Sequence, residues 1–256
     1  MFRPRLIPVL LIKDGALIKT KKFKSSVYIG DPINAVKIFN ELKADELIFL
    51  DISATKEKRL ISLDLISAVG EEANMPFAVG GGIATIEDIR KIINIGAERV
   101  VLGSAVVQNP RFIKESTDYF GSSTISVCID VKKNFFGKHF VYYKNGSIAS
   151  KYNPRNFAVI VEECGAGEII LQSISNDGMR CGYDIDLLRS VSEVLSIPIV
   201  ALGGAGSIED FKTVYQKGYV NGIAAGSEFV FHGDKEGVLI NYPKKEDIIN
   251  LFSFKK

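Results

Sequence analysis

Eight short apolar runs, separated by amphipathic stretches, most restrict what this chain of 256 residues can fold into. The runs are near-continuous and rich in β-branched residues, which is typical of strands buried on both faces of a parallel sheet. They lie at residues 6–12, 47–52, 77–79, 99–102, 125–130, 168–172, 199–202 and 222–225. Asp31-Pro32 and Asn153-Pro154 are helix starts, and three glycines stand where helix ends are expected: Gly96, Gly165 and Gly218. Strand–helix units of about 32 residues predict an α/β fold, a (β/α)8 TIM barrel.

An internal repeat divides the chain into two similar parts. The cluster Val79-Gly80-Gly81-Gly82-Ile83 is followed by Ser104, 23 residues after Gly81. The cluster Leu202-Gly203-Gly204-Ala205-Gly206 is followed by Ser227, 23 residues after Gly204, and the two clusters lie 123 residues apart. No linker rich in Pro, Gly or Ser separates the parts. We therefore expect one domain, residues 1–256, built of two similar half-barrels at about 1–122 and 123–256.

Composition and charge exclude several classes of protein. Hydrophobic residues are 46% and charged residues 24% of the chain, as in ordinary globular proteins. A net charge of +2, without a basic cluster, predicts no nucleic-acid partner and no membrane partner. The three cysteines lack CxxC spacing, which argues against structural zinc and against a secreted disulfide scaffold. The first apolar run is too short for a transmembrane helix and poorly shaped for a signal peptide, so we expect a soluble cytoplasmic protein.

Glycine clusters at the strand ends indicate phosphate binding. In a barrel of this type the active site lies where the carboxyl ends of the strands meet. Glycine lets the backbone approach a ligand, and the helix that follows directs free N–H groups at an anion. Gly81-Gly82 and Gly204 therefore predict two phosphates on opposite sides of the barrel mouth, and Asp177-Gly178 forms a third turn that is placed to serve the second. Alternatively, the glycines only form the turn that connects each strand to the helix after it.

Asp130 closes the fifth run, where a catalytic carboxylate would point into the mouth. Alternatively, it caps a helix or loop. The equivalent place on the first run holds Leu11 and Ile12, and Asp14 follows in the turn. The chain has no HxxxH, no Cys/His cluster and no GxSxG. We therefore expect no metal site, no cofactor and no Ser-His-Asp triad.

Several segments, taken together, resemble one known family. They are Arg5–Gly15, Asp31-Pro32, Glu46–Ile52, Val79–Ile83, Gly165–Ile170, Ser173–Gly178, Gly182–Asp184 and Gly203–Gly206, within about residues 3–232. As a set they are similar to the cyclase subunit (HisF) family of imidazole glycerol phosphate synthase. The resemblance implies a barrel that binds a phosphorylated small molecule at its mouth and a glutaminase subunit at its bottom face. Ammonia then passes through the barrel to the mouth, where the family cleaves and cyclises a phosphoribulosyl formimino substrate.

The resemblance also implies that one catalytic group is missing. The family uses two aspartates as acid and base; Asp130 matches the second, and Leu11 stands in place of the first. Losing a general acid or base typically costs about 10²–10⁴ in rate. Lys19 matches a catalytic residue of the family's first mobile loop. The phosphate turns after the fourth and eighth strands fall on Gly103-Ser104, where the family has Asn-Thr, and on Gly226-Ser227.

A ring of alternating charges is implied at the bottom of the barrel. Arg5, Glu46 and Glu168 match three members of the family's charged ammonia gate, and Arg99 replaces its lysine, which keeps the charge but not the shape. Glu98 stands where the family has an aspartate that faces the glutaminase. Alternatively, the four gate residues form ordinary salt bridges at the strand starts.

The departures match a branch of the family that is associated with acetamidino sugars in surface-polysaccharide gene clusters. This branch shares Lys22-Phe23-Lys24, Val230–Gly233 and Asn241–Pro243. Our first hypothesis is a barrel that pairs with a glutaminase and conducts its ammonia to a separate, ATP-dependent sugar amidotransferase. The alternative is the ammonia-dependent lyase and cyclase of histidine biosynthesis, against which Leu11 argues. Other phosphate-binding barrels, such as sugar-phosphate isomerases, are the remaining alternative.

Overall fold

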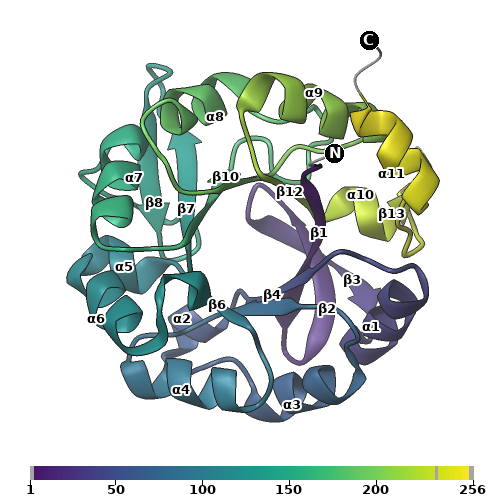
Figure 1. Cartoon of the computed structure of the whole chain (residues 1–256), viewed down its shortest axis with the longest axis horizontal. Helices are drawn as coiled ribbons and strands as arrows, with labels where there is room; N and C mark the ends of the chain where they lie inside the picture. The colour runs from purple at the N-terminus through teal and green to yellow at the C-terminus, as the bar shows by residue number, and fades with distance from the viewer. Residues whose placement is uncertain (1–2, 234–235, 254–256) are drawn as a thin grey trace.

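The computed structural model describes residues 3–233 and 236–253, and these form a closed parallel barrel. The strands follow the order β10-β11-β12-β1-β4-β5-β6-β7, and β7 pairs with β10 to close the ring. They are β1 (Arg5–Lys13), β4 (Leu47–Asp51), β5 (Phe77–Gly80), β6 (Arg99–Leu102), β7 (Ile125–Lys133), β10 (Glu168–Ser173), β11 (Ile199–Leu202) and β12 (Gly222–Ala225). Figure 1 looks along the barrel and shows the helices as a ring around it. The predicted (β/α)8 TIM barrel is confirmed.

Helices connect the strands and cover the outside of the barrel. They are α1 (Pro32–Glu41), α2 (Ala54–Glu57), α3 (Leu63–Glu72), α4 (Ile86–Asn94), α5 (Ser104–Gln108), α6 (Arg111–Phe120), α7 (Pro154–Glu163), α8 (Ile185–Ser192), α9 (Ile208–Gly218), α10 (Ser227–Val230) and α11 (Lys245–Phe252), with a 3-10 turn at Ser122–Thr124. Asp31 and Asn153 begin α1 and α7 as predicted, because their side chains accept hydrogen bonds from Asn34 N at 2.8 Å and from Arg155 N at 2.9 Å.

One expected helix end is displaced. Gly96 and Gly165 follow α4 and α7 with φ of +110° and +92°, as expected of glycines that end helices. Gly218 is instead the last residue of α9, and Tyr219 takes the left-handed conformation. A Cβ at Gly218 would lie 3.2 Å from Cγ2 of Val214, so this glycine allows close packing inside the helix.

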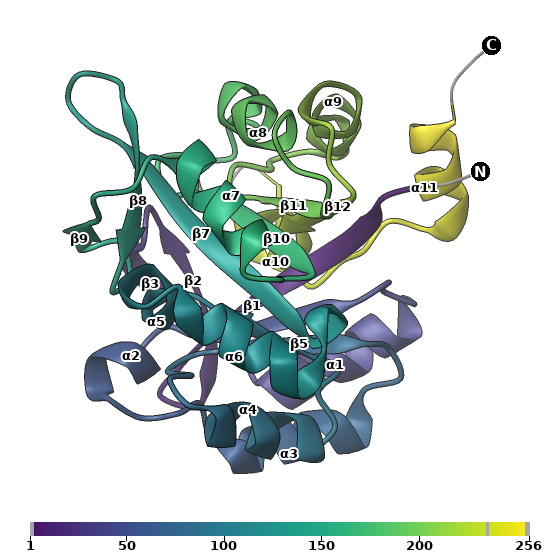
Figure 2. The ribbon, with the colours of Figure 1, turned by 60° about the vertical axis from the view of Figure 1, so that its left-hand side comes forward.

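Two hairpins extend the barrel wall. β1 turns at Asp14-Gly15 into β2 (Ala16–Lys21) and β3 (Lys24–Gly30); both turn residues have positive φ, as favoured two-residue hairpin loops require. β7 runs three residues past Asp130 and pairs with β8 (His139–Tyr143), which pairs with β9 (Ile148–Ala149). Figure 2 shows the β7–β8 loop projecting beyond the helices. A further short pair is formed by β13 (Phe231–His232) and β14 (Gly237–Val238).

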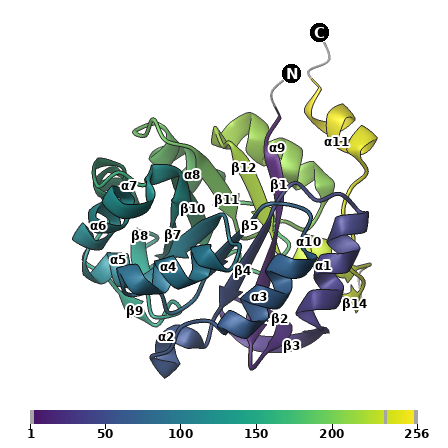
Figure 3. The same ribbon diagram turned by 60° about the horizontal axis from the view of Figure 1, so that its bottom comes forward.

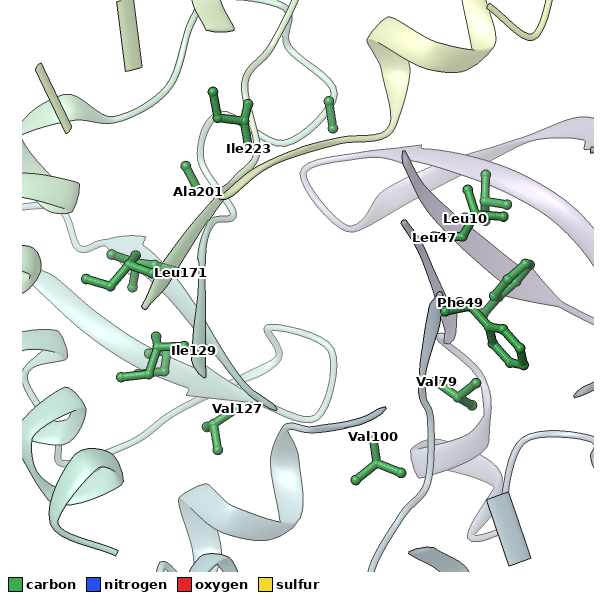
Figure 4. Close-up of a cluster of buried hydrophobic side chains, with 14 of the residues drawn as sticks. Leu10, Leu47, Phe49, Val79, Val100, Val127, Ile129, Leu171, Ala201 and Ile223 are labelled. Atoms are coloured by element: carbon green, nitrogen blue, oxygen red, sulfur yellow. The ribbon is translucent and has the colours of Figure 1, made fainter. Parts of the chain in front are cut away.

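Alternate strand residues face opposite sides of the wall and build two apolar clusters. Leu6 and Leu10 of β1 pack in the cluster between wall and helices, whereas Ile7 and Leu11 pack in the cluster inside the barrel. Figure 4 shows the outer cluster, whose labelled side chains point away from the centre of the barrel. The interior is therefore filled by side chains, as in other barrels of this size.

The beginning and the end of the described chain lie on the same side of the molecule, with α11 near the start of β1 (Figure 3). Tyr242, shortly before α11, donates to the carbonyl oxygen of Leu6 at 3.0 Å and accepts from Asp45 N at 3.1 Å. These bonds attach the C-terminal segment to the bottom of the barrel. Within the described ranges, no helix has the length and apolar character needed to cross a bilayer.

Candidate functional site

A cavity of about 500 Å³ opens at the carboxyl ends of the barrel strands. Its lining includes Leu11, Gly81, Gly82, Gly103, Ser104, Cys128, Asp130 and Gln172. The fold thus brings Asp130 together with the first glycine cluster and with the turn after β6, which are far apart in the sequence. A concave cavity with few converging polar groups is the typical form of a small-molecule site.

Asp130 lines this cavity beside a thiol and an amide. Sγ of Cys128 is 3.5 Å from Oδ1 of Asp130 and 3.8 Å from Oε1 of Gln172. Burial raises the pKa of Asp130 to about 7; the Cys128 hydrogen bond opposes the shift and the charge of Asp177 adds to it. A carboxyl group with this pKa can both give and accept a proton near neutral pH.

Leu11 faces the same cavity and offers no group for proton transfer. It is 8% exposed and belongs to the apolar cluster inside the barrel. The other carboxylates in the cavity lining are already engaged: Asp51 lies 2.6 Å from Nη1 of Arg59, and Asp88 accepts from the backbone of Thr85 at 2.9 Å. Among the described residues of the lining, Asp130 is therefore the one carboxylate with neither an ion pair nor a helix to cap.

The second set of predicted phosphate turns lies under the β2–β3 hairpin. Lys19 is buried in β2, and its Nζ lies 3.0 Å from Oδ1 of Asp177. A Cβ on Gly178 would overlap the carbonyl oxygen of Thr20, and one on Gly226 would lie 2.9 Å from Cε of Lys19. Gly204 and Ser227 are also buried and do not line the cavity.

The expectation that Lys19 lies in a loop is therefore wrong. The Asp14-Gly15 turn reverses the chain, so that Lys19 follows in a strand paired with β1 and β3. The same pairing places its ammonium group against turns that follow β10 and β12.

Four charged side chains form a closed ring at the opposite end of the barrel. Arg5 bonds to Oε2 of Glu46 at 2.6 Å and to Glu168. Arg99 bonds to Glu46 and lies 3.5 Å from Oε1 of Glu168. Each residue stands at or just before the start of a different strand. Because the strand starts meet at one end of the barrel, charges that are far apart in the sequence form a ring across its bottom.

Burial and charge act against each other in this ring. Burial raises the pKa of the Glu46 carboxyl, although Arg99 and Arg5 oppose the shift. Burial alone would lower the pKa of Arg5, but the carboxylates of Glu168 and Glu46 outweigh it and raise that pKa. Ser126, on β7, adds a hydrogen bond to Oε1 of Glu168 at 3.3 Å. Removing one carboxylate would leave two partly buried arginines to share the other, so each of the four residues depends on the rest of the ring.

Glu98 lies beside this ring, directly before β6. Its backbone N–H donates to the carbonyl oxygen of Phe77 at 3.1 Å, and its side chain is exposed. No salt bridge within residues 3–233 and 236–253 involves this carboxylate. It is therefore available to a partner that approaches the bottom face.

Comparison with known proteins gives a consistent result. A family model described as "Histidine biosynthesis protein" matches residues 5–235. A protein of Pseudomonas aeruginosa, provisionally named imidazole glycerol phosphate synthase subunit hisF2, is 44% identical over 95% of this chain and 97% of its own. One of Leptospira interrogans, provisionally named subunit HisF, is 42% identical over 98% of this chain and 100% of its own. Imidazole glycerol phosphate synthase subunit HisF of Natranaerobius thermophilus is 39% identical over 97% of this chain and 98% of its own.

The chain belongs to the HisF family of histidine biosynthesis proteins. In this HisF family member, two further residues of β7 contribute to the sites, although no sequence motif marks them. Cys128 adjoins Asp130, and Ser126 supports the charged ring. Both share the inward face of β7 with Asp130, because side chains alternate along a strand. The alternation of Ser126, Cys128 and Asp130 with apolar residues in this run could have identified Ser126 and Cys128 as inward-facing neighbours of the sites.

Proposed function

We propose that this chain is the ammonia-accepting barrel of a glutaminase-coupled synthase. The observation that carries the proposal is the closed ring of Arg5, Glu46, Arg99 and Glu168. The ring spans the strand starts of the barrel, so a molecule that enters from the bottom face meets it first. A glutaminase subunit docked at Glu98 would release ammonia beside this gate.

The interior of the barrel suits neutral ammonia better than ammonium. Beyond the ring, the inward side chains are apolar, among them Ile7, Ile48 and Ile170. Transfer of an unpaired cation into such surroundings is costly, whereas a small neutral molecule meets a much smaller penalty. Ammonia that passes the gate would arrive at the cavity beside Asp130.

The names of the relatives favour one reaction at that cavity, the ammonia-dependent lyase and cyclase step of imidazole glycerol phosphate synthase. In this reading Asp130 transfers protons, because its pKa of about 7 suits both directions. Gly81, Gly82, Gly103 and Ser104 bind one phosphate. Lys19, Asp177, Gly178, Gly204, Gly226 and Ser227 bind the second after the β2–β3 hairpin moves.

A second candidate function is favoured by Leu11. A leucine at the place of the family's first catalytic aspartate, inside the cavity, leaves Asp130 without its expected partner. The barrel would then pass ammonia on without cyclising a substrate. The recipient would be an ATP-dependent amidotransferase that converts the acetamido group of a surface-polysaccharide sugar into an acetamidino group.

Turnover of the phosphoribulosyl formimino substrate with free ammonia separates the two candidates. Free ammonia makes the glutaminase unnecessary, so the assay tests only whether the cavity at the barrel mouth catalyses the reaction. Turnover of about 1 s⁻¹ or more by the purified protein supports the cyclase reaction. No turnover by folded protein, together with a gain of activity in Leu11→Asp, supports ammonia delivery to a separate enzyme.

A further inference from the structure

The β7–β8 hairpin and the segment after it carry a local excess of positive charge. Residues 131–161 contain six basic residues and no acidic one, although the chain has a net charge of only +2. The basic residues are Lys132, Lys133, Lys138, Lys144, Lys151 and Arg155. The sequence-based expectation of no membrane partner rested on the small net charge and on the lack of a basic cluster, and this segment runs against the second of these reasons.

The tip of the hairpin exposes two adjacent aromatic rings. Phe135 is 98% exposed and Phe136 is 82% exposed, with their ring centroids 5.6 Å apart. The loop that carries them projects beyond the helices in Figure 2. Large apolar side chains that gather on an exposed surface mark an interaction site, whereas single ones are common.

The backbone of the tip is hydrogen-bonded within the tip itself. Oδ1 of Asn134 accepts from the N–H groups of Phe136 and Lys138, both at 3.0 Å. The N–H of Asn134 donates to the carbonyl oxygen of Lys138 at 2.8 Å, and Gly137 N–H donates back to Asn134 at 3.0 Å. These bonds hold both phenylalanines outward. They also reduce the cost of moving the tip into an apolar medium, where unsatisfied backbone groups are expensive.

A second cavity, of about 340 Å³, lies at the base of the tip. Its lining includes Lys138, His139, Asn153, Arg155 and Ser190. Oδ2 of Asp184 lies 3.2 Å from Nε2 of His139 and also 3.2 Å from Nζ of Lys133, so this carboxylate is already paired. Lys138 and Arg155 are exposed, and no carboxylate within the described ranges pairs with either. Two uncompensated cations beside an open cavity favour an anionic group there.

We propose that this hairpin docks the protein on a membrane surface that contains anionic phospholipid. Phe135 and Phe136 enter the interfacial layer, while Lys138 and Arg155 bind a headgroup phosphate in the cavity behind them. A projecting apolar tip with cations at its base matches the layered chemistry of a lipid interface, with apolar chains beneath charged headgroups. The proposal concerns the outer rim of the barrel and does not depend on the ammonia reaction.

A single tryptophan can report insertion, because the chain contains none. In Phe136→Trp we expect the emission to shift to shorter wavelength with vesicles of phosphatidylglycerol and phosphatidylcholine. Vesicles of phosphatidylcholine alone should give little shift, and added salt should reduce the response, since screening weakens the attraction. An unchanged emission on the anionic vesicles overturns the proposal.

Vesicle sedimentation of the full chain provides a second measurement. We expect Phe135→Ser/Phe136→Ser to weaken binding to anionic vesicles roughly tenfold or more, because two buried rings are lost. Lys138→Gln/Arg155→Gln should remove the preference for phosphatidylglycerol. Tyr119→Ser is the matched control, since Tyr119 is an aromatic residue of α6 with 68% exposure. Equal binding of the serine double variant and the wild type would show that the tip does not enter the membrane and would overturn the proposal.

Discussion

Asp130 differs from the other carboxylates of the mouth in what surrounds it. Asp51 is held by Arg59 at 2.6 Å, whereas Asp130 has a thiol as its hydrogen-bond partner. Among the described residues, no cation offsets the loss of hydration, so burial dominates and the pKa of Asp130 rises to about 7. The environment of a single residue thus makes it an acid and a base near neutral pH.

Asp130→Asn should change the pH dependence of stability. The carboxyl titrates near pH 4 when unfolded and at about 7 when folded. Between these values the folded state binds more protons, so the free energy of unfolding falls as pH rises through this window. Asparagine cannot ionise, so the variant should be more stable than wild type at pH 8 by about 2–4 kcal/mol.

Urea unfolding at pH 5 and pH 8 checks this prediction. Asp118→Asn is the control, because Asp118 is an exposed carboxylate of α6. A wild type and an Asp130→Asn variant with parallel pH profiles would show that Asp130 titrates normally.

At the scale of the element, α4 and α9 begin in the same way although they lie in different parts of the chain. Thr85 accepts from Asp88 N at 3.1 Å, and Asp88 accepts in return from Thr85 N at 2.9 Å. Ser207 and Asp210 repeat this arrangement, with the return bond at 3.0 Å. This reciprocal arrangement is a capping box, and it satisfies N–H groups that a helix start would otherwise leave unpaired. Both capping boxes follow a glycine cluster.

Ser207→Ala should lower the free energy of unfolding by about 1 kcal/mol, because alanine cannot accept the bond from Asp210 N. Thr85→Ala should have a similar effect. Ser192→Ala is the comparison, since the Ser192 hydroxyl lies at the exposed end of α8 and caps no helix start. Chemical denaturation measures all three, and equal loss in the Ser192 variant would argue against a capping effect.

At the scale of the whole molecule, the bottom and the mouth of the barrel carry different chemistry. The bottom presents the charged ring and the exposed Glu98, and the mouth presents the cavity with Asp130. The barrel interior lies between them, so events at the two faces are separated by the length of the strands. A partner can occupy the bottom face while a ligand occupies the mouth.

Glu98→Ala tests the bottom face. We expect roughly tenfold weaker binding of the cognate glutaminase, or a comparable loss of its activation, with the free energy of unfolding unchanged because Glu98 is exposed. Glu193→Ala, an exposed carboxylate of the α8 end, is the control. If Glu98→Ala leaves both binding and glutamine hydrolysis untouched, Glu98 is not at the interface. If the wild-type chain does not raise glutamine hydrolysis, the partnership itself is contradicted.

Local patterns in the sequence predicted the eight barrel strands and the starts of α1 and α7. Each depends on neighbours within a few residues, so the sequence alone is enough to predict it. The division into half-barrels and the roles of the site residues stay predictions. The end of α9 was not predicted correctly: Tyr219, and not Gly218, has the left-handed conformation, and Gly218 stays in the helix, where a Cβ would lie 3.2 Å from Cγ2 of Val214.

Only the tertiary structure decided what surrounds the site residues. Lys19 bonds to Asp177, 158 residues away in the sequence, and the hairpin that carries Lys19 covers the second set of predicted phosphate turns. The tertiary structure also decided the raised pKa of Asp130. It decided the exposure of Phe135 and Phe136 as well, because from sequence alone two adjacent phenylalanines could equally belong to a core. Burial, charge pairing and exposure depend on residues that only folding brings together, and a sequence pattern records none of those distances.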